Sequence, residues 1–576
     1  MRPPYSFLPT ALDDGRVWGF GINLYGLRSR RNWGIGDFDD LLVFVHYAAR
    51  LGAGIVGVNP LHALHALDPE AASPYSPTSR YYRNPLYIAV EAVPEFASDH
   101  ERAVALRERV RSDAFGAMLE ALRAASHVAY ARVARAKFSA LDECYAVFRE
   151  YRGERLAAFR VFCERGGERL ERFAVHEALT ERFARASGGE RGWLAWPTEF
   201  RDAGGADVRA FAVRERRRVD YFKYLQWVAD EQLARVAEAA RGMAIGLYLD
   251  VAVGVDRNSS DVWSDPAAYV LDETIGAPPD PLGPSGQNWG LPPPDPARLI
   301  ADGGLAFEEL LAKNMAYAGA LRLDHVMALL RLYRIPAGGS ARDGRYVAYP
   351  FDELLALAAT ASHGARCMIV GEDLGNVPDG FRERMAREAI FSYRLLLFER
   401  DAVGAFVPPH AYPERALATA TTHDLPTLSA WALGRDLSTR MALDLLDRDA
   451  FERSRCDRRV EVTRLFDALV TAGELDADGV EHLHGTIDAS PGDARPLEAL
   501  VRAAYRFLAR SRAKIVLVQL DDALGELDLV NVPGTASEYP NWRRKSSLDL
   551  DAFVGDARLA SLASDVHRIL HERVVS

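Results

Sequence analysis

The feature that most constrains the fold of this chain is a set of short apolar runs that each end in an acidic residue. Residues 245–249 lead to Asp250, 320–323 to Asp324, 367–371 to Glu372 and 418–423 to Asp424. A run of about four to seven apolar or β-branched residues is typical of a buried strand. In a parallel α/β barrel the carboxyl ends of such strands converge on one face, where chemistry is done. The pattern therefore predicts an enzyme.

The apolar runs also predict how many strands the fold has. Candidate strands lie at 17–24, 55–58, 245–250, 320–324, 367–370, 390–398, 417–422 and 515–520, and amphipathic stretches such as 38–51 and 351–361 lie between them. Strand and helix in alternation predict an α/β fold, a (β/α)8 TIM barrel. A doubly wound open sheet is the alternative, but no Gly-rich dinucleotide turn follows the first run.

Uneven spacing between these strands predicts three insertions within one catalytic barrel of residues 1–576. A charged, helical insertion is expected at 97–218, between the second and third strands, and another at 430–509, after the seventh. Between them, 271–299 is rich in proline and glycine and is expected to form an active-site loop without a secondary-structure frame. All three follow carboxyl ends of strands, so we expect them to surround the mouth of the site.

Composition excludes several classes of protein. The net charge of −11 argues against a nucleic-acid groove. The four cysteines are scattered without C-x-x-C spacing, which favours a reducing cytoplasm over a disulfide framework or a zinc site. Residues 1–16 contain no apolar stretch of signal-peptide length, and no apolar run reaches about 18 residues, so we expect neither a secretion signal nor a membrane span. His62 and His65 have no third ligand nearby, and we expect no metal site there.

Longer motifs make the prediction specific. They are NLYGLRS from residue 23, NWGIGD from 32, PLHALHALDPEAASPYSPTSRYYRNPLYI from 60, GLYLDVAVGV from 246, GAPPD with GQNWG from 276, LRLDHVM from 321, GEDLG from 371, TTHDLPT from 421 and GTASEYPNWRRK from 534. In this order they resemble the amylomaltases, which are 4-α-glucanotransferases (disproportionating enzymes) of the α-amylase clan. The resemblance implies a (β/α)8 barrel with helical subdomains, no C-terminal β-domain, no metal or other cofactor and a double-displacement mechanism.

The carboxylates suit this chemistry. Transfer with retention needs a nucleophilic carboxylate and a second carboxyl group that protonates the leaving oxygen. Arg322 lies two positions before Asp324, so both side chains share one face of a strand and the cation keeps Asp324 ionised. We predict Asp324 as the nucleophile and Glu372 as the acid/base, with Asp373 capping the following turn. The resemblance implies that Asp424 holds sugar hydroxyls and distorts the ring.

Further residues are predicted to bind substrate. We expect His423 to donate a hydrogen bond to the same sugar as Asp424, and Asp250 to position either the substrate or Arg322. Tyr75 and Trp289 are expected to stack on apolar sugar faces, the alternative being that each packs its own loop. His325 is left open between lining the acceptor side and packing. Asn84 is expected to order the loop before a strand-like NPLYI.

The resulting hypothesis is a cytoplasmic 4-α-glucanotransferase. Its expected partners are malto-oligosaccharides and other α-1,4-glucans as donor and acceptor, and glucose as acceptor, with no nucleic acid and no membrane. An α-glucan hydrolase of the same clan and a catalytically idle glycogen- or starch-binding protein are the alternatives. The oligomeric state is left open.

Overall fold

Eight parallel strands close into a barrel in the computed structural model, which describes residues 3, 5–66, 68–187, 192–279, 285–487 and 497–572. Around the barrel the order is β1, β14, β13, β12, β11, β8, β5, β2. The strands are β1 (Val17–Ile22), β2 (Ile55–Val58), β5 (Gly246–Val251), β8 (Ala320–Leu323), β11 (Met368–Gly371), β12 (Phe391–Leu395), β13 (Ala416–Thr419) and β14 (Ile515–Gln519). All eight predicted strands and the TIM barrel are confirmed, and the open sheet is excluded because β1 pairs with both β2 and β14.

Helices cover the barrel because their apolar faces must leave water. They include α1 (Phe38–Arg50), α8 (Arg216–Ala240), α11 (Leu305–Met315), α12 (Phe351–Ala365), α13 (Phe381–Arg387), α18 (Glu498–Ala509), α19 (Leu520–Leu524) and α20 (Ala557–His571). Helix α1 packs on α8, α11 on α12, and α18 on α20. The helices predicted at 38–51 and 351–361 are confirmed as α1 and α12. None of the helices in the described part of the chain is long and apolar enough to span a bilayer.

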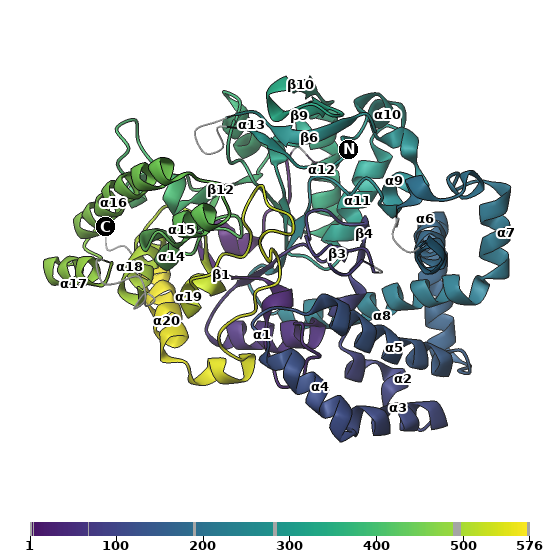
Figure 1. The fold of residues 1–576 in the computed structure, drawn as a ribbon. Helices are drawn as coiled ribbons and strands as arrows, with labels where there is room; N and C mark the ends of the chain where they lie inside the picture. The colour runs from purple at the N-terminus through teal and green to yellow at the C-terminus, as the bar shows by residue number, and fades with distance from the viewer. Residues whose placement is uncertain are drawn as a thin grey trace.

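A group of helices fills the interval between β2 and the barrel helix α8. After the hairpin β3 (His62–Ala63) and β4 (Ser79–Arg83) come α2 (Pro94–Ala97), α3 (Glu101–Arg111), α4 (Asp113–Ala124), α5 (Tyr130–Phe148), α6 (Glu154–Ser187) and α7 (Ala206–Arg214). Figure 1 shows α2 to α5 at the lower right of the barrel and α6 and α7 at its right. NPLYI is not strand-like: Asn84 caps a 3-10 turn at Pro85–Tyr87, because its side chain accepts from the Leu86 amide.

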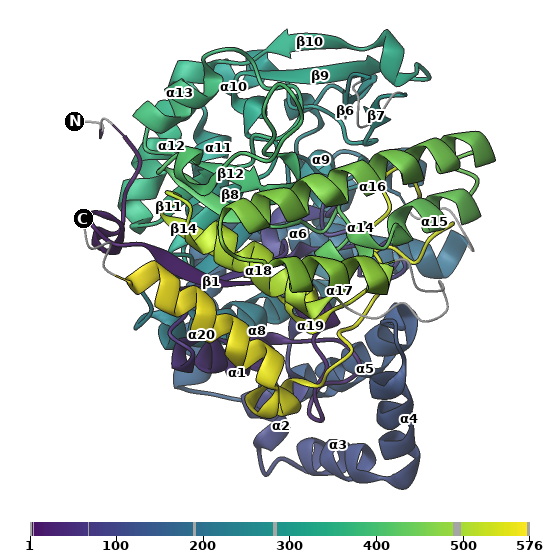
Figure 2. The same ribbon diagram turned by 90° about the vertical axis from the view of Figure 1, so that its left-hand side faces the viewer.

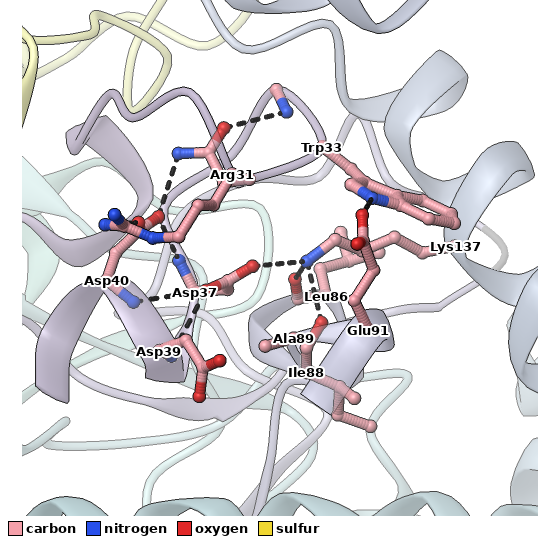
Figure 3. Close-up of polar contacts among 12 residues, drawn as sticks. Arg31, Trp33, Asp37, Asp39, Asp40, Leu86, Ile88, Ala89, Glu91 and Lys137 are labelled. Carbon is pink, nitrogen blue, oxygen red and sulfur yellow. Dashed lines mark hydrogen bonds and ion pairs between the residues drawn. The ribbon is translucent and has the colours of Figure 1, made fainter. Parts of the chain in front are cut away.

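A buried lysine ties this helical group to the barrel (Figure 3). Lys137 of α5 is fully buried and donates through Nζ to the carbonyl oxygens of Leu86 and Ile88, at 2.7 and 2.8 Å. The same Nζ lies 3.6 Å from a carboxylate oxygen of Asp37. Asp37 forms a capping box with Asp40 at the start of α1. The lysine therefore joins α5 to the first helix of the barrel.

The proline-rich interval carries more regular structure than predicted. Its strands β6 (Glu273–Ala277) and β7 (Gln287–Asn288) join β9 (Arg331–Pro336) and β10 (Arg345–Ala348) in a four-stranded antiparallel sheet of order β10-β9-β6-β7. The prediction of a loop at 271–299 without a secondary-structure frame is therefore wrong. The frame comes from β9, far along the chain, whose backbone pairs with β6. Residues 280–284 lie outside the described part.

A last group of helices follows β13. It consists of α14 (Leu428–Ala432), α15 (Arg435–Ala442), α16 (Arg448–Thr471) and α17 (Ala477–Ile487), which precede α18. Figure 1 shows this group on the side of the barrel away from α6 and α7, and Figures 1 and 2 both show β9 and β10 at the top of the view. Parts of the two ranges predicted as helical insertions, 188–191 and 488–496, lie outside the described residues.

Candidate active site

Strand register brings the predicted site residues together at the carboxyl ends of β5, β8 and β11. Asp250 on β5 is aligned with Arg322 on β8, and Leu323 on β8 with Gly371 on β11. Asp324 and Glu372 each follow one of these last two residues. The Glu372 amide donates to the Leu323 carbonyl at 3.0 Å. Neighbouring parallel strands thus place both candidate catalytic carboxyl groups at one edge of the barrel.

Arg322 lies between two carboxylates. Its Nη1 donates to both oxygens of Asp250, at 2.9 and 2.8 Å, and its Nη2 lies 2.9 Å from Asp324 Oδ1. Arg322 and Asp250 are buried, whereas the Asp324 side chain stays 18% exposed. The cation therefore faces a carboxylate that a ligand can still reach, as a nucleophile requires. Asp250 thus holds Arg322 by an ion pair, while its role in positioning Arg322 or the substrate stays a prediction.

The environment of Glu372 suits a proton donor. Its carboxylate accepts hydrogen bonds from the amides of His325 and Leu374, each at 2.8 Å. Burial raises the pKa of Glu372 to about 7, because Arg322 and these two amides offset only part of the desolvation and the charge of Asp324 adds to it. A carboxyl group with such a pKa can hold its proton near neutral pH, whereas an ordinary glutamate cannot.

His325 carries a backbone conformation that the sequence did not reveal. Its φ of 46° lies in the left-handed region, which is uncommon for a residue with a Cβ and often marks functional sites. This conformation aims the His325 amide at Glu372. Burial lowers the pKa of the His325 imidazole to about 4, so the ring is neutral at pH 7.

Trp289 lies against this histidine. The two ring centroids are 5.2 Å apart in an edge-to-face arrangement, and the indole Nε1 donates to Gln287 Oε1 at 2.9 Å. The backbone amide of Trp289 also donates to the Ile275 carbonyl. Trp289 therefore lies beside His325 and on the side of the site that carries Glu372. Its ring is only partly buried.

Tyr75 and His423 form a stacked pair on the other side of the site. The ring centroids are 4.7 Å apart, and the Tyr75 hydroxyl lies 3.3 Å from His423 Nδ1. The same hydroxyl donates to Asp250 Oδ2 at 2.6 Å. Both rings, with Asp250 and Arg322, line a pocket that reaches into the barrel. This arrangement joins the loop that carries Tyr75 to the ion pairs of the site.

Asp424 is held in place by two side chains. His423 Nε2 lies 3.2 Å from one of its oxygens, and Asn531 Nδ2 donates to the other at 2.7 Å. The carboxylate is partly desolvated, but His423 and Asn531 outweigh this and lower the pKa of Asp424 to about 2. For His423, burial lowers the pKa while Asp424 raises it, and the net pKa lies above the ordinary value. The side chain of Asp424 stays 51% exposed, so its carboxylate is charged and open to a ligand.

The loop that carries His423 and Asp424 is fixed by a buried aspartate. Asp522 accepts from Thr421 Oγ1 at 2.9 Å and from the Leu428 amide at 2.7 Å, one at each end of the loop. It also accepts from the Tyr505 hydroxyl at 2.7 Å. Burial raises the pKa of Asp522 to about 6.

No sequence pattern marked Asn531, Asp522 or Trp542 as site residues. Trp542, whose ring centroid lies 5.2 Å from that of His423, is part of the GTASEYPNWRRK motif. Asp373 does not cap the following turn: it accepts hydrogen bonds from Arg382, Ser392 and the Tyr393 amide, which ties β11 to β12.

The two histidines considered for a metal have other partners. His62 accepts from the Ala252 amide and His65 pairs with Asp256.

A closed (β/α)8 barrel whose rim carries an arginine-paired aspartate beside a buried glutamate with a raised pKa is typical of one class of protein, the enzymes that act on glycosidic bonds. Comparison with known proteins makes this more specific. The 4-alpha-glucanotransferase family model matches residues 22–549. A 4-alpha-glucanotransferase of Haemophilus influenzae is 37% identical over 96% of this chain and 78% of its own length. One of Mycobacterium tuberculosis H37Rv is 34% identical over 98% and 77%.

Solved structures agree with the sequence comparison. The amylomaltase of Corynebacterium glutamicum superposes with a TM-score of 0.84, at 28% identity over 98% of this chain and 77% of that one. An amylomaltase of Streptococcus agalactiae, solved in complex with acarbose, shares the fold with a TM-score of 0.72 at 18% identity. The chain belongs to the 4-alpha-glucanotransferase family, so the predicted resemblance is confirmed.

Proposed function

We propose that this protein transfers segments of α-1,4-glucans between malto-oligosaccharides, with glucose among its acceptors, by a retaining double displacement. The observation that carries the proposal is the contrast between two neighbouring carboxyl groups. Asp324 is paired with Arg322 at 2.9 Å, whereas burial raises the pKa of Glu372 to about 7. Retaining transfer needs one carboxylate that attacks and one carboxylic acid that gives a proton.

In the first step Asp324 bonds to the anomeric carbon while the glycosidic bond breaks, and Glu372 donates its proton to the leaving oxygen. In the second step Glu372 takes a proton from the acceptor hydroxyl. That oxygen attacks the anomeric carbon and displaces Asp324. The two carboxyl groups supply both the nucleophile and the proton, so these steps call for neither a metal nor a cofactor.

The other site residues are proposed to hold the sugar. Asp424 is exposed and ionised beside His423, so both can bind hydroxyls of the glucosyl unit under attack. Tyr75 lines the pocket and donates its hydroxyl hydrogen bond to Asp250. Trp289 and His325 lie together on the acid/base side, where an acceptor sugar enters, and the indole can stack on that sugar. We also place the protein in the cytoplasm; its four cysteines, all in the described residues, form no disulfide.

Incubation with maltotriose alone, followed by chromatography of the products, tests the proposal. We expect a ladder of longer maltodextrins together with glucose. Asp324→Asn, nearly isosteric but unable to attack, is the matched control and should lose activity by several orders of magnitude. Release of glucose and maltose without any lengthening would identify a hydrolase. No reaction at all from the wild type would contradict the proposed transfer and favour the alternative of a glucan-binding protein.

A further inference from the structure

Trp542 lies directly behind the site, at the meeting point of three separate segments. Its indole is 5% exposed and packs against both rings of the stacked pair, with centroids 5.5 Å from Tyr75 and 5.2 Å from His423. These rings contact Asp250 and Asp424, and Asp250 in turn holds Arg322. A displacement of the indole would therefore displace the ring of Tyr75 or His423, and with it the contact of that ring with Asp250 or Asp424.

The backbone of Trp542 is held in a strained conformation. Its φ of 61° lies in the left-handed region, which a residue with a Cβ adopts only when its surroundings enforce it. Two hydrogen bonds supply this constraint. The Trp542 amide donates to the Val530 carbonyl at 3.0 Å, and the Trp542 carbonyl accepts from the Tyr130 hydroxyl at 2.8 Å.

The hydrogen bond from the Trp542 amide to the Val530 carbonyl connects Trp542 to the site through a second set of contacts. Val530 precedes Asn531, whose side-chain amide donates to Asp424 at 2.7 Å. The backbone of Trp542 thus helps to place Asn531, while its side chain supports His423. Asp424 and His423, which are paired with each other, are both supported from this one residue.

The second bond reaches the helical group between β2 and α8. Tyr130 is the first residue of α5, and the chain just before it pairs with the chain just after Trp542: the Val128 amide donates to the Arg543 carbonyl at 2.7 Å, and the Lys545 amide to the Ser126 carbonyl at 2.9 Å. These bonds fix the distance between α5 and the segment that carries the indole. They give the helical group a physical connection to the active site.

We propose that Trp542 is a positioning residue of the transfer reaction and that Tyr130 holds it in place, so that the helical group sets the geometry of the sugar site. The proposal rests on the function proposed above. Trp542 contacts no reacting atom. It acts through Tyr75 and His423 on one route and through Asn531 on the other.

Paired variants test the side chain. Trp542→Leu removes the aromatic surface, whereas Trp542→Phe keeps a ring, and both retain a Cβ and hence the same backbone strain. With maltotriose we expect kcat of the leucine variant to fall about 100-fold, as for a site misplaced by about 1 Å, with KM changed by less than about threefold. The phenylalanine variant should recover most of kcat. Equal losses in both variants, or a loss that only follows the folded fraction, would overturn the proposal.

A second pair tests the connection to α5. Tyr130→Phe removes only the hydroxyl that binds Trp542, and Tyr47→Phe is its matched control. The Tyr47 hydroxyl, on α1, likewise donates to a backbone carbonyl, that of Phe553 at 3.1 Å, but has no contact with the site residues described above. The two variants should lose similar thermal stability, and only Tyr130→Phe should lower kcat, by about tenfold. Equal activity of the two would show that the helical group does not act through Tyr130.

A readout independent of turnover separates this inference from the proposed function. In a crystal structure of Trp542→Leu we expect the Tyr75 hydroxyl to leave Asp250, from which it is 2.6 Å away in the wild type. Unmoved Tyr75 and His423 rings would refute the positioning role even if the enzyme catalysed some other reaction. A wild-type enzyme that fails to lengthen maltotriose would instead refute the proposed function.

Discussion

At the residue scale, the site places two similar carboxyl groups, those of Asp324 and Glu372, in different surroundings. Asp324 is 18% exposed, and its Oδ1 lies 2.9 Å from Arg322 Nη2. Glu372 is buried and faces the charge of Asp324, and its pKa rises to about 7. The residue type alone does not distinguish a proton donor from a nucleophile, because aspartate and glutamate have nearly equal pKa values in water.

Replacing Glu372 separates protonation from attack. Glu372→Gln cannot protonate a sugar leaving group, so maltodextrins should react at least about 100-fold more slowly. The donor α-maltosyl fluoride needs little protonation and should still glycosylate Asp324, because fluoride leaves without an acid. Mass spectrometry should detect the trapped maltosyl adduct on the peptide that contains Asp324. The same loss of rate on both donors would indicate that Glu372 binds or packs rather than donates a proton.

The raised pKa of Glu372 also predicts a pH dependence. The acid must carry its proton, so kcat/KM should be level just below pH 7 and fall about tenfold per pH unit above it. With α-maltosyl fluoride the glycosylation step should lack this alkaline decline. If the rate declines above pH 7 with both donors, the titration of a group other than Glu372 causes the decline.

The raised pKa of Glu372 also makes the stability of the folded protein depend on pH. The folded-state pKa lies above the unfolded value of 4.5, so the native state binds more protons between about pH 4.5 and 7. In that window the contribution of Glu372 to stability falls as pH rises, and the fall ends above about pH 7. The difference in melting temperature between wild type and Glu372→Gln, followed across the window, isolates this group. A difference that does not vary with pH would contradict the raised pKa.

At the element scale, the proline-rich segment shows how distant strands decide the shape of an active-site loop. Strands β6 and β7 are short, and neither would be stable alone. Pairing of β6 with β9 creates the sheet on which Trp289 lies, and the indole then contacts His325, close to the carboxyl end of β8. The prolines limit the backbone, but the frame comes from the sheet.

Removal of Trp289 should change the fate of the covalent intermediate. We expect Trp289→Ala to increase the share of intermediate captured by water about fivefold, because one aromatic contact is worth about 1 kcal/mol, while donor cleavage falls less. Release of reducing ends is compared with chain lengthening on maltotriose at several glucose concentrations. Tyr346→Ala, which removes a half-exposed aromatic ring from β10 of the same sheet, is the control. An unchanged partition between water and sugar would mean that Trp289 only packs its loop.

At the scale of the whole molecule, long-range polar contacts determine how the helical groups sit on the barrel. Lys137 of α5 is buried between Asp37 at the start of α1 and two backbone carbonyls (Figure 3). Burial and the neighbouring Asp40 raise the pKa of Asp37, and Lys137 offsets part of this shift. A buried lysine is costly to desolvate, so its partners must all be in place.

Lys137→Met should therefore destabilise the protein. The methylene chain still fills the space, but Asp37 and the two carbonyls lose their partner, and the free energy of unfolding should fall by about 3 to 5 kcal/mol in urea titrations. Lys223→Met, which removes a lysine paired with the more exposed Glu171, is the control and should cost less. Adding Asp37→Asn to Lys137→Met should restore part of the loss. A double variant with purely additive losses would show that the two groups do not interact.

The barrel, its eight strands and the identity of the charged residues at its rim could all be predicted from the amino-acid sequence. Apolar runs that end in Asp250, Asp324, Glu372 and Asp424 carry that information locally, because burial of a strand and the end of that strand are properties of a few adjacent residues. The neighbours that these residues contact could not be predicted in this way. The positive φ of His325, the bond from Asn531 to Asp424, the sheet beneath Trp289 and the position of Trp542 behind Tyr75 and His423 all depend on segments tens to hundreds of residues apart. Such contacts leave no periodic pattern in the sequence, since they form only when the closed barrel brings its loops together.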